Sequence, residues 1–239
     1  MTDVHIVIPS RIGSTRLSKK PLQKLGNKTL LERVFDNAAE SKFSSIFIAT
    51  DDREILDLAS NFCNNIIITS AEHVSGTDRI HELCTKMQFN PEDVVINLQG
   101  DEPFMPLEII NAMPDILDGF DVATACVPIL DDEDIENINN VKVCFSKDRA
   151  LYFSRSVIPD NFTNTDVDYY KHIGIYAYKV KTLKTISSLK PTKLELAEKL
   201  EQLRFLDHGL HIGIRNFNVK APIGIDTQED LIKAQKLFS

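Results

Sequence analysis

The amino-terminal half of the chain alternates short apolar runs with stretches of helical periodicity, and this alternation constrains the fold more than any other feature. The apolar runs are rich in β-branched residues and predict strands at residues 4–9, 45–50, 65–69 and 93–98. The stretches between them repeat apolar residues at helical spacing and predict helices at residues 29–40, 52–62 and 77–87. Strands this apolar are buried on both faces, as in a parallel sheet covered by helices. We therefore expect an α/β fold with a mostly parallel, doubly wound sheet and helices on both faces.

The carboxy-terminal half has a different character, with several strand patterns and few helices between them. Strands are predicted at residues 121–129, 141–145, 151–153, 172–178 and 211–217. Helices are predicted at residues 183–189, 194–206 and 227–238. This mixture predicts a smaller α+β lobe packed on the sheet, so that the chain forms one domain with an added lobe.

The overall charge and the length of the apolar runs argue against several classes of function. With 27 Lys and Arg against 35 Asp and Glu, the chain has a formal net charge of −8, which disfavours nucleic acids and anionic membranes as partners. No apolar run approaches the roughly 20 residues that a membrane span requires, and the first residues lack the pattern of a signal peptide. We expect a cytoplasmic protein whose four cysteines are reduced thiols of the core.

A basic loop, PSRIGSTRLSKKPL, follows the first predicted strand at residues 9–22. It contains Gly13 and four cations, Arg11, Arg16, Lys19 and Lys20, and it has no acidic residue. Ligands of such folds bind beyond the carboxyl ends of the strands, where backbone N–H groups and cations suit a polyphosphate. The loop has neither the Walker A pattern nor the dinucleotide-binding glycine pattern. A solvated basic loop is the alternative interpretation.

Two acidic turns are candidates for a Mg²⁺ site, since this ion prefers one or two carboxylates together with phosphate oxygens and water. Asp101 lies in the turn QGDEP after a buried strand, and Asp226 lies in GIDT before the last predicted helix. Asp226 has an alternative interpretation as a helix N-cap, with Glu229 at the N3 position. Ser75 and Thr77 are similarly plain N-cap candidates for the helix that follows them. No pattern of nucleophilic catalysis stands out, so the residues favour metal- and cation-assisted chemistry on a phosphorylated substrate.

Several blocks of sequence together resemble one enzyme family. The blocks are IPSRIGSTRL, ATDD, HVSGTDR, NLQGDEP, VKV, ALYFSR, YKHIGIYAY, AEKLEQLRFL and GIDTQEDL. Their order is that of the 3-deoxy-manno-octulosonate cytidylyltransferases, also called CMP-Kdo synthetases, and the resemblance spans residues 4–231. It implies a nucleotide-diphospho-sugar transferase-like fold that converts CTP and Kdo into CMP-Kdo and pyrophosphate with Mg²⁺, for lipopolysaccharide biosynthesis. It further implies a homodimer, with residues 1–120 binding the nucleotide, residues 121–220 forming a sugar-binding and dimerisation lobe, and residues 221–239 supplying a metal-ligand turn and helix.

The resemblance also assigns roles to individual residues. It implies catalytic roles for Arg11, Lys20, Asp101 and Asp226, with the two aspartates as metal ligands. The residues that match nucleotide-binding positions are Arg11, Ser14, Lys20, His73, Ser75, Gly76, Arg79 and Gln99. The residues that match positions around the sugar acid are Gln99, Arg155, His172, Tyr176, Glu201 and Gln202. Arg155 is of the type that pairs bidentately with a carboxylate.

Four positions depart from the family pattern, and at one of them, Ser10 in place of Ala, the change is mild. Ser18 and Lys19 stand where Pro and Gly are usual, so that Lys19 is a competitor of Lys20 for the phosphates, and Asp160 stands where an aromatic residue is common. The alternative substrates are therefore 8-amino-Kdo and a sialic acid-like sugar. A nucleotide-binding module that has lost catalysis is the alternative from a different functional class.

Overall fold

A computed structural model describes residues 2–13, 16–73, 75–163 and 165–238 of the chain. The expected alternation of the amino-terminal half is present as four parallel strands in the order β5-β4-β1-β6. They are β1 (Val4–Ser10), β4 (Ser45–Thr50), β5 (Ile66–Ile68) and β6 (Val94–Asn97). Their carboxyl ends therefore meet at one edge of the sheet, and the loops that follow them gather there.

Helices cover both faces of this sheet, as the burial of consecutive strand residues requires. Ile6 and Ile8 of β1 belong to one hydrophobic core, whereas Val7 between them belongs to the other. The first core contains residues of α1 (Leu30–Ala39), α2 (Arg53–Ala59) and α4 (Leu107–Leu117). The second contains residues of α3 (Gly76–Lys86), α6 (Val180–Ile186) and α8 (Gln202–Asp207). The expected α/β class is confirmed.

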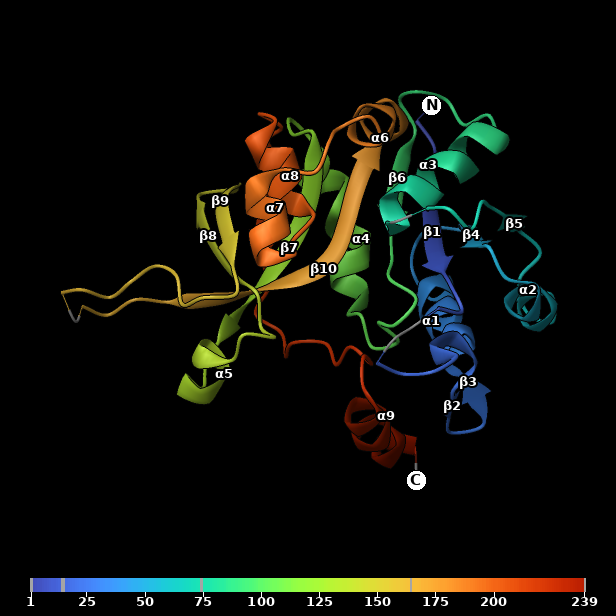
Figure 1. Cartoon of the computed structure of the whole chain (residues 1–239), viewed down its shortest axis with the longest axis horizontal. Helices are drawn as coiled ribbons and strands as arrows, with labels where there is room; N and C mark the ends of the chain where they lie inside the picture. Colours follow the sequence, from blue (N-terminus) through green and yellow to red (C-terminus); the bar gives the residue numbers. More distant parts are fainter. Residues whose placement is uncertain (1, 14–15, 74, 164, 239) are drawn as a thin grey trace.

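One antiparallel strand joins the two halves of the molecule (Figure 1). β10 (Tyr169–Lys179) lies between β6 and β7 (Val122–Ile129) and is antiparallel to both. The sheet continues through β11 (Ile212–Asn216), β9 (Arg149–Ser154) and β8 (Lys142–Ser146) to nine strands. It is thus parallel in its amino-terminal half and mixed in its carboxy-terminal half.

The structure contains elements that the sequence patterns did not predict. The largest is α4, which starts directly after Pro106 and contains Pro114, so that its two prolines obscure an otherwise apolar helical pattern. The others are η1 (Lys20–Leu22), the hairpin of β2 (Lys24–Leu25) and β3 (Lys28–Thr29), and α5 (Asp132–Glu136). In the described part of the chain, no helix is long and apolar enough to cross a membrane.

The prediction of one helix at residues 194–206 is wrong, because two helices occupy this segment. The first, α7 (Lys193–Glu198), is followed by Lys199, whose left-handed φ of 54° ends the helix before α8 begins. The last predicted helix is present as α9 (Gln228–Gln235) followed by η2 (Lys236–Phe238). In Figure 1, α9 lies at the bottom of the molecule, beside the β2–β3 hairpin.

Candidate active site

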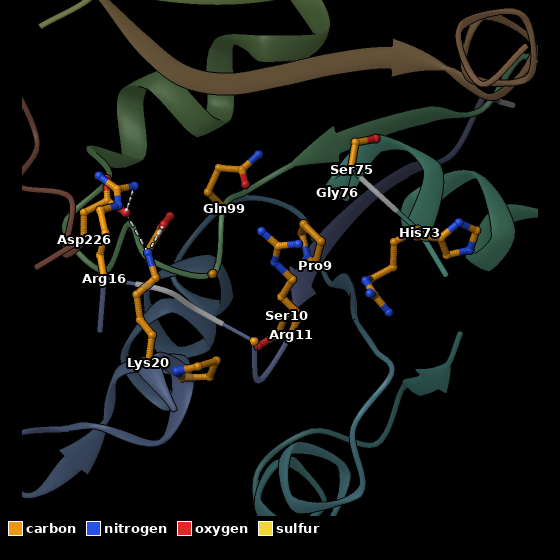
Figure 2. Close-up of a pocket in the computed structure, with 15 residues that line it drawn as sticks. Pro9, Ser10, Arg11, Arg16, Lys20, His73, Ser75, Gly76, Gln99 and Asp226 are labelled. Atoms are coloured by element: carbon orange, nitrogen blue, oxygen red, sulfur yellow. Dashed lines mark hydrogen bonds and ion pairs between the residues drawn. The ribbon is translucent and has the colours of Figure 1, made fainter. Parts of the chain in front are cut away.

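A cleft of about 280 Å³ lies beyond the carboxyl ends of β1 and β6. Its walls come from the basic loop, the start of α3, the turn after β6 and the turn before α9. The lining residues are Pro9, Ser10, Arg11, Gly13, Arg16, Lys20, Pro21, His73, Ser75, Gly76, Arg79, Gln99, Gly100, Asp101 and Asp226. Figure 2 shows Asp226, Arg16 and Lys20 at one end, Ser75, Gly76 and His73 at the other, and Gln99 between them. Every described residue predicted to bind the nucleotide or the metal therefore lines one cleft, and Ser14 lies outside the described residues.

Close backbone contacts hold the loops of the cleft together. A Cβ atom on Gly100 would lie 2.9 Å from the Pro9 carbonyl oxygen, so only glycine lets the loops after β1 and β6 approach this closely. On the α3 side, a Cβ atom on Gly76 would lie 3.4 Å from Cγ of Pro9. Ser75 is the N-cap of α3, because its Oγ accepts a hydrogen bond from the Asp78 amide. Ser75 thus has the capping role and lines the cleft as well.

Lys20 brings the two acidic turns together. Its Nζ donates to Oδ2 of Asp101 at 2.5 Å and to Oδ1 of Asp226 at 2.8 Å. Arg16, another of the four cations of the basic loop, also pairs with Asp226 at 2.9 Å. Burial acts to lower the pKa of Lys20, but the two carboxylates outweigh it and the pKa is raised. The ammonium is therefore charged at neutral pH, and the two carboxylates share one cation.

Asp226 is not the N-cap of the last helix, so that alternative interpretation is wrong. Thr227 is the cap, and Asp230 rather than Glu229 is its capping-box partner. Because the cap is one residue further along the chain, the carboxylate of Asp226 turns toward Lys20 and Arg16. A backbone hydrogen bond of 2.9 Å from the Ile225 amide to the Asp101 carbonyl oxygen joins the two acidic turns directly.

The chemistry of this pair fits a hard divalent cation. Asp101 and Asp226 supply two carboxylates that already converge on one positive charge, and Mg²⁺ uses such a pair with phosphate oxygens and water. Among the described residues there is no cluster of three or more His, Cys, Asp or Glu that would form an all-protein metal site. The remaining ligands would have to come from a bound phosphate and from water.

Glu102, next to Asp101, is a buried acid that the sequence analysis did not single out. Burial, together with the neighbouring Asp101 and Asp226 carboxylates, raises its pKa to about 8. Its Oε2 is buried and has no hydrogen-bond partner among the described residues. The carboxyl group packs against Gly224, where a Cβ atom would lie 2.9 Å from Oε1. A largely protonated Glu102 adds little negative charge to the two carboxylates in front of it.

His73 and Arg79 line the cleft but are also held by other protein groups. Nε2 of His73 lies 2.5 Å from Oε2 of Glu82. The guanidinium of Arg79 is almost fully buried and donates to Oδ2 of Asp51 at 2.8 Å and to Oγ1 of Thr69 at 2.5 Å. Arg79 therefore ties the start of α3 to the ends of β4 and β5 while it lines the cleft.

Lys19, one of the departures from the family pattern, does not face the cleft. Its Nζ donates to both carboxylate oxygens of Glu54 in α2, at 2.8 and 2.6 Å. The residue has a φ of 46°, in the left-handed region that favours glycine. Lys20 alone of this pair of lysines lines the cleft, so the expected competition between them for phosphates is absent from this arrangement.

The residues predicted to surround the sugar, Gln99 excepted, are not among those that line the cleft. They lie on β10, on α8 and at the end of β9. His172 is buried, its Nε2 lies 2.9 Å from Oγ1 of Thr124, and burial lowers its pKa to about 3. Burial raises the pKa values of Tyr176 and Glu201, and the side chain of Gln202 is buried.

A hydrogen bond connects this second group to the start of α3. Thr77, the residue after Gly76, donates through Oγ1 to Oε2 of Glu201 at 2.7 Å. Oε1 of Glu201 is buried and has no hydrogen-bond partner in the described part of the chain. Arg155 lies further away, where its guanidinium donates to backbone carbonyl groups. The structure thus places the predicted nucleotide and metal residues in one cleft and the predicted sugar residues beside it.

Comparisons with known proteins point to one enzyme family. The Cytidylyltransferase family profile matches residues 5–212. A 3-deoxy-manno-octulosonate cytidylyltransferase from Francisella tularensis subsp. novicida is 45% identical, with 100% of both chains covered. Another from Bacteroides thetaiotaomicron is 42% identical, covering 97% of this chain and 96% of its own. A solved structure of CMP:2-keto-3-deoxy-manno-octonic acid synthetase complexed with CTP is 37% identical, with a TM-score of 0.90 and coverage of 99% of this chain and 98% of its own.

The full-length matches and the convergence of Lys20, Asp101 and Asp226 in one cleft lead to the same assignment. The chain belongs to the cytidylyltransferase family of nucleotidyltransferases and, within it, to the 3-deoxy-manno-octulosonate cytidylyltransferases.

Proposed function

We propose that this protein transfers the CMP group of CTP to the anomeric hydroxyl of Kdo, releasing pyrophosphate and forming CMP-Kdo for lipopolysaccharide biosynthesis. The observation that carries the proposal is the cleft in which Lys20, Asp101 and Asp226 converge from three distant segments of the chain. Relatives of matching length bear the name of this activity, and a similar solved structure is described as a complex with CTP.

The cations of the cleft suit the triphosphate of CTP. Arg11, Arg16 and Lys20 line the cleft together with Gly13. In the proposed complex, these cations offset the negative charge that develops on the α-phosphate and on the leaving pyrophosphate. The loops around Ser75 and Gln99 hold the nucleotide so that the α-phosphate is exposed to the sugar hydroxyl, which is the positioning part of the catalysis.

Asp101 and Asp226 are the residues that would hold a divalent metal, Mg²⁺ in this proposal. When bound there, the ion would neutralise phosphate charge and lower the pKa of a coordinated hydroxyl. Lys20 must then leave the carboxylates, and the negatively charged phosphates of CTP are the nearest replacement partner for its ammonium. Glu102, with its raised pKa, limits the negative charge behind this exchange.

The sugar acid is proposed to bind between the cleft and the second half of the sheet. Gln99 lines the cleft, and the polar groups of His172, Tyr176, Glu201 and Gln202 lie on the elements beside it. We assign residues 1–120 to the nucleotide, residues 121–220 to the sugar and to a homodimer contact, and residues 221–239 to the metal-ligand turn. The doubly wound, nucleotide-diphospho-sugar transferase-like description belongs to the same proposal, and the burial of β1 residues in two separate cores supports it.

A pyrophosphate-release assay with CTP and Mg²⁺ tests the proposal. We expect turnover with Kdo, and loss of turnover in Asp101→Asn and Asp226→Asn without loss of folding. Asp57→Asn, on the exposed side of α2, is the matched control and is expected to keep the wild-type rate. Folded Asp101→Asn and Asp226→Asn variants with wild-type rates would refute the metal assignment.

A panel of sugar acids completes the assay, because Asp160 departs from the family pattern. Kdo, 8-amino-Kdo and sialic acid are compared at equal concentrations with saturating CTP. If kcat/KM is larger for 8-amino-Kdo or for sialic acid than for Kdo, that sugar rather than Kdo is the substrate. Tight binding of CTP with no product from any of the three would instead identify a nucleotide-binding module without catalysis.

A further inference from the structure

Lys142, the central residue of the VKV block and the first residue of β8, has a fully buried side chain. Its Nζ donates to three backbone carbonyl oxygens: Asn137 at 3.0 Å, Asn140 at 2.7 Å and Arg155 at 2.6 Å. An ammonium group has three donors, so every donor of Lys142 is used within the protein. The group neither faces the cleft nor touches solvent.

Burying this charge costs free energy, which indicates that the ammonium serves to fix the three carbonyl groups that it binds. A buried ammonium is normally paired with a carboxylate, yet in the described part of the chain Lys142 bonds only to neutral carbonyl groups. Burial lowers its pKa, the nearby Arg155 lowers it further, and Glu198 acts in the opposite direction. A methionine would fill the same volume without this cost, since replacing buried charges by apolar groups is often neutral or stabilising.

Through the three carbonyl groups, Lys142 restrains Arg155 in two ways. The first is direct, because Lys142 binds the carbonyl oxygen of Arg155 itself. The second passes through the loop before β8, in which Lys142 binds the carbonyl groups of Asn137 and Asn140. Between them, the carbonyl oxygen of Ile138 accepts a hydrogen bond of 3.0 Å from Nη1 of Arg155. Lys142 thus fixes both the backbone of Arg155 and one acceptor of its guanidinium.

Glu198 of α7 holds Arg155 from the opposite side. Its Oε2 accepts from the Arg155 amide at 3.0 Å, and its carbonyl oxygen accepts from Nε at 2.8 Å. Its Oε1 accepts from Ser154 at 2.6 Å, which fixes the carboxylate. In the described part of the chain, these contacts leave Nη2 of Arg155 without a hydrogen bond.

We propose that Lys142 is a positioning residue that orients Arg155 so that its free guanidinium nitrogen binds the carboxylate of the sugar acid. The inference rests on the proposed function, because it takes from the family resemblance that Arg155 binds the carboxylate of the sugar acid. Lys142 acts only through Arg155 and the loop at residues 137–140, and it does not touch the substrate.

The test separates binding of the sugar from binding of the nucleotide. In Lys142→Met we expect the KM for Kdo to rise about tenfold, the size of effect that follows from losing the alignment of one charge-assisted hydrogen bond. The KM for CTP is expected to change less than about twofold, because the nucleotide cleft makes no contact with Lys142. Lys181→Met, which removes an exposed ammonium on α6, is the control for loss of charge and is expected to match the wild type.

Further variants keep the inference falsifiable if Lys142→Met does not fold. Lys142→Gln and Lys142→Arg keep hydrogen-bond donors but cannot reach all three carbonyl oxygens in the same geometry, and both are expected to raise the KM for Kdo selectively. Any folded variant of Lys142 with a wild-type KM for Kdo, or with equal rises for Kdo and CTP, overturns the role of Lys142.

Arg155→Ala distinguishes failure of the inference from failure of the proposed function. If this variant keeps the wild-type KM for Kdo, Arg155 does not bind the sugar and the proposed function of the sugar lobe is wrong. If Arg155→Ala raises that KM and the folded Lys142 variants do not, only the positioning role of Lys142 is refuted.

Discussion

Replacing Lys20 with Met tests a competition between a lysine ammonium and a metal ion for the same two carboxylates. The Nζ of Lys20 lies 2.5 Å from Asp101 and 2.8 Å from Asp226, and its side chain is only 15% exposed. A metal ion that enters the protein without CTP must displace this ammonium. The variant removes the cation that both carboxylates share and leaves both carboxylates in place, with Arg16 still paired with Asp226.

The magnitude follows from the exposure of the partners. The Asp101 and Asp226 side chains are 29% and 44% exposed, so each ion pair contributes about 0.5–1 kcal/mol rather than the larger value of a buried pair. Losing about 1–2 kcal/mol of competition strengthens metal binding to the free protein about tenfold. Turnover with CTP changes in the opposite direction and falls about a hundredfold or more, because a cation facing the reacting phosphates is lost.

Mn²⁺ binding measured by electron paramagnetic resonance, in the absence of nucleotide, is the assay. Lys19→Met is the matched control, because it removes the neighbouring lysine charge, which is paired with Glu54 and does not face the carboxylates. We expect tighter Mn²⁺ binding in Lys20→Met and unchanged binding in Lys19→Met. Equal or weaker Mn²⁺ binding by a folded Lys20→Met protein would show that the ammonium and the metal do not share a site.

Three further perturbations have defined outcomes. Gly100→Ala places a Cβ atom 2.9 Å from the Pro9 carbonyl oxygen. Unfolding in urea should therefore show a free energy of unfolding lower by about 1–3 kcal/mol, and kcat/KM for CTP should fall. Gly174→Ala is the control, because its Cβ atom meets no atom within 4 Å, and it should retain the wild-type kcat/KM. Lys19→Gly should be more stable than Lys19→Ala by about 1 kcal/mol in the same measurement, because both lose the exposed ion pair but only glycine relieves the left-handed φ. Burial acts to raise the pKa of Glu82, but the hydrogen bonds to its carboxylate outweigh burial and lower the pKa to about 2. The contribution of Glu82 to the free energy of unfolding should therefore be complete above about pH 5 and should decrease as the pH falls toward 2. Urea midpoints of wild type and Glu82→Gln should therefore differ at pH 7 and converge on acidification, and a constant difference would contradict the assignment.

The nucleotide end of the site could be predicted from the sequence because it follows from the topology of parallel strands. Once residues 4–9 and 93–98 are identified as neighbouring buried strands, the loops with Arg11, Lys20 and Gln99 must lie at the same edge of the sheet. Asp226 is different. Its local sequence is equally compatible with a helix cap, and only the resemblance to a family distinguished the two roles before Thr227 was seen to be the cap.

The remaining features depend on contacts between distant residues that local patterns do not encode. The antiparallel insertion of β10 between β6 and β7 is a pairing over long sequence separations, and nothing in YKHIGIYAY specifies its direction. The burial of Lys142 is equally hidden, because a lysine within a strand pattern predicts an exposed side chain. Helix α4 was missed because Pro106 and Pro114 look like breaks, although the first directly precedes the helix.

The position of β10 also has a consequence for how the chain folds during synthesis. β6 is complete at Asn97, but the residues of β10 that pair with its free edge are Tyr176–Lys179. At the usual rates of translation, the roughly eighty residues between them take several seconds to make. Throughout that interval the emerging amino-terminal half displays an unpaired apolar strand edge, which is a template for pairing with other chains. The interval between the synthesis of β6 and that of β10 is therefore the stage of folding most exposed to aggregation. Chaperones that bind nascent chains have their greatest effect during this interval.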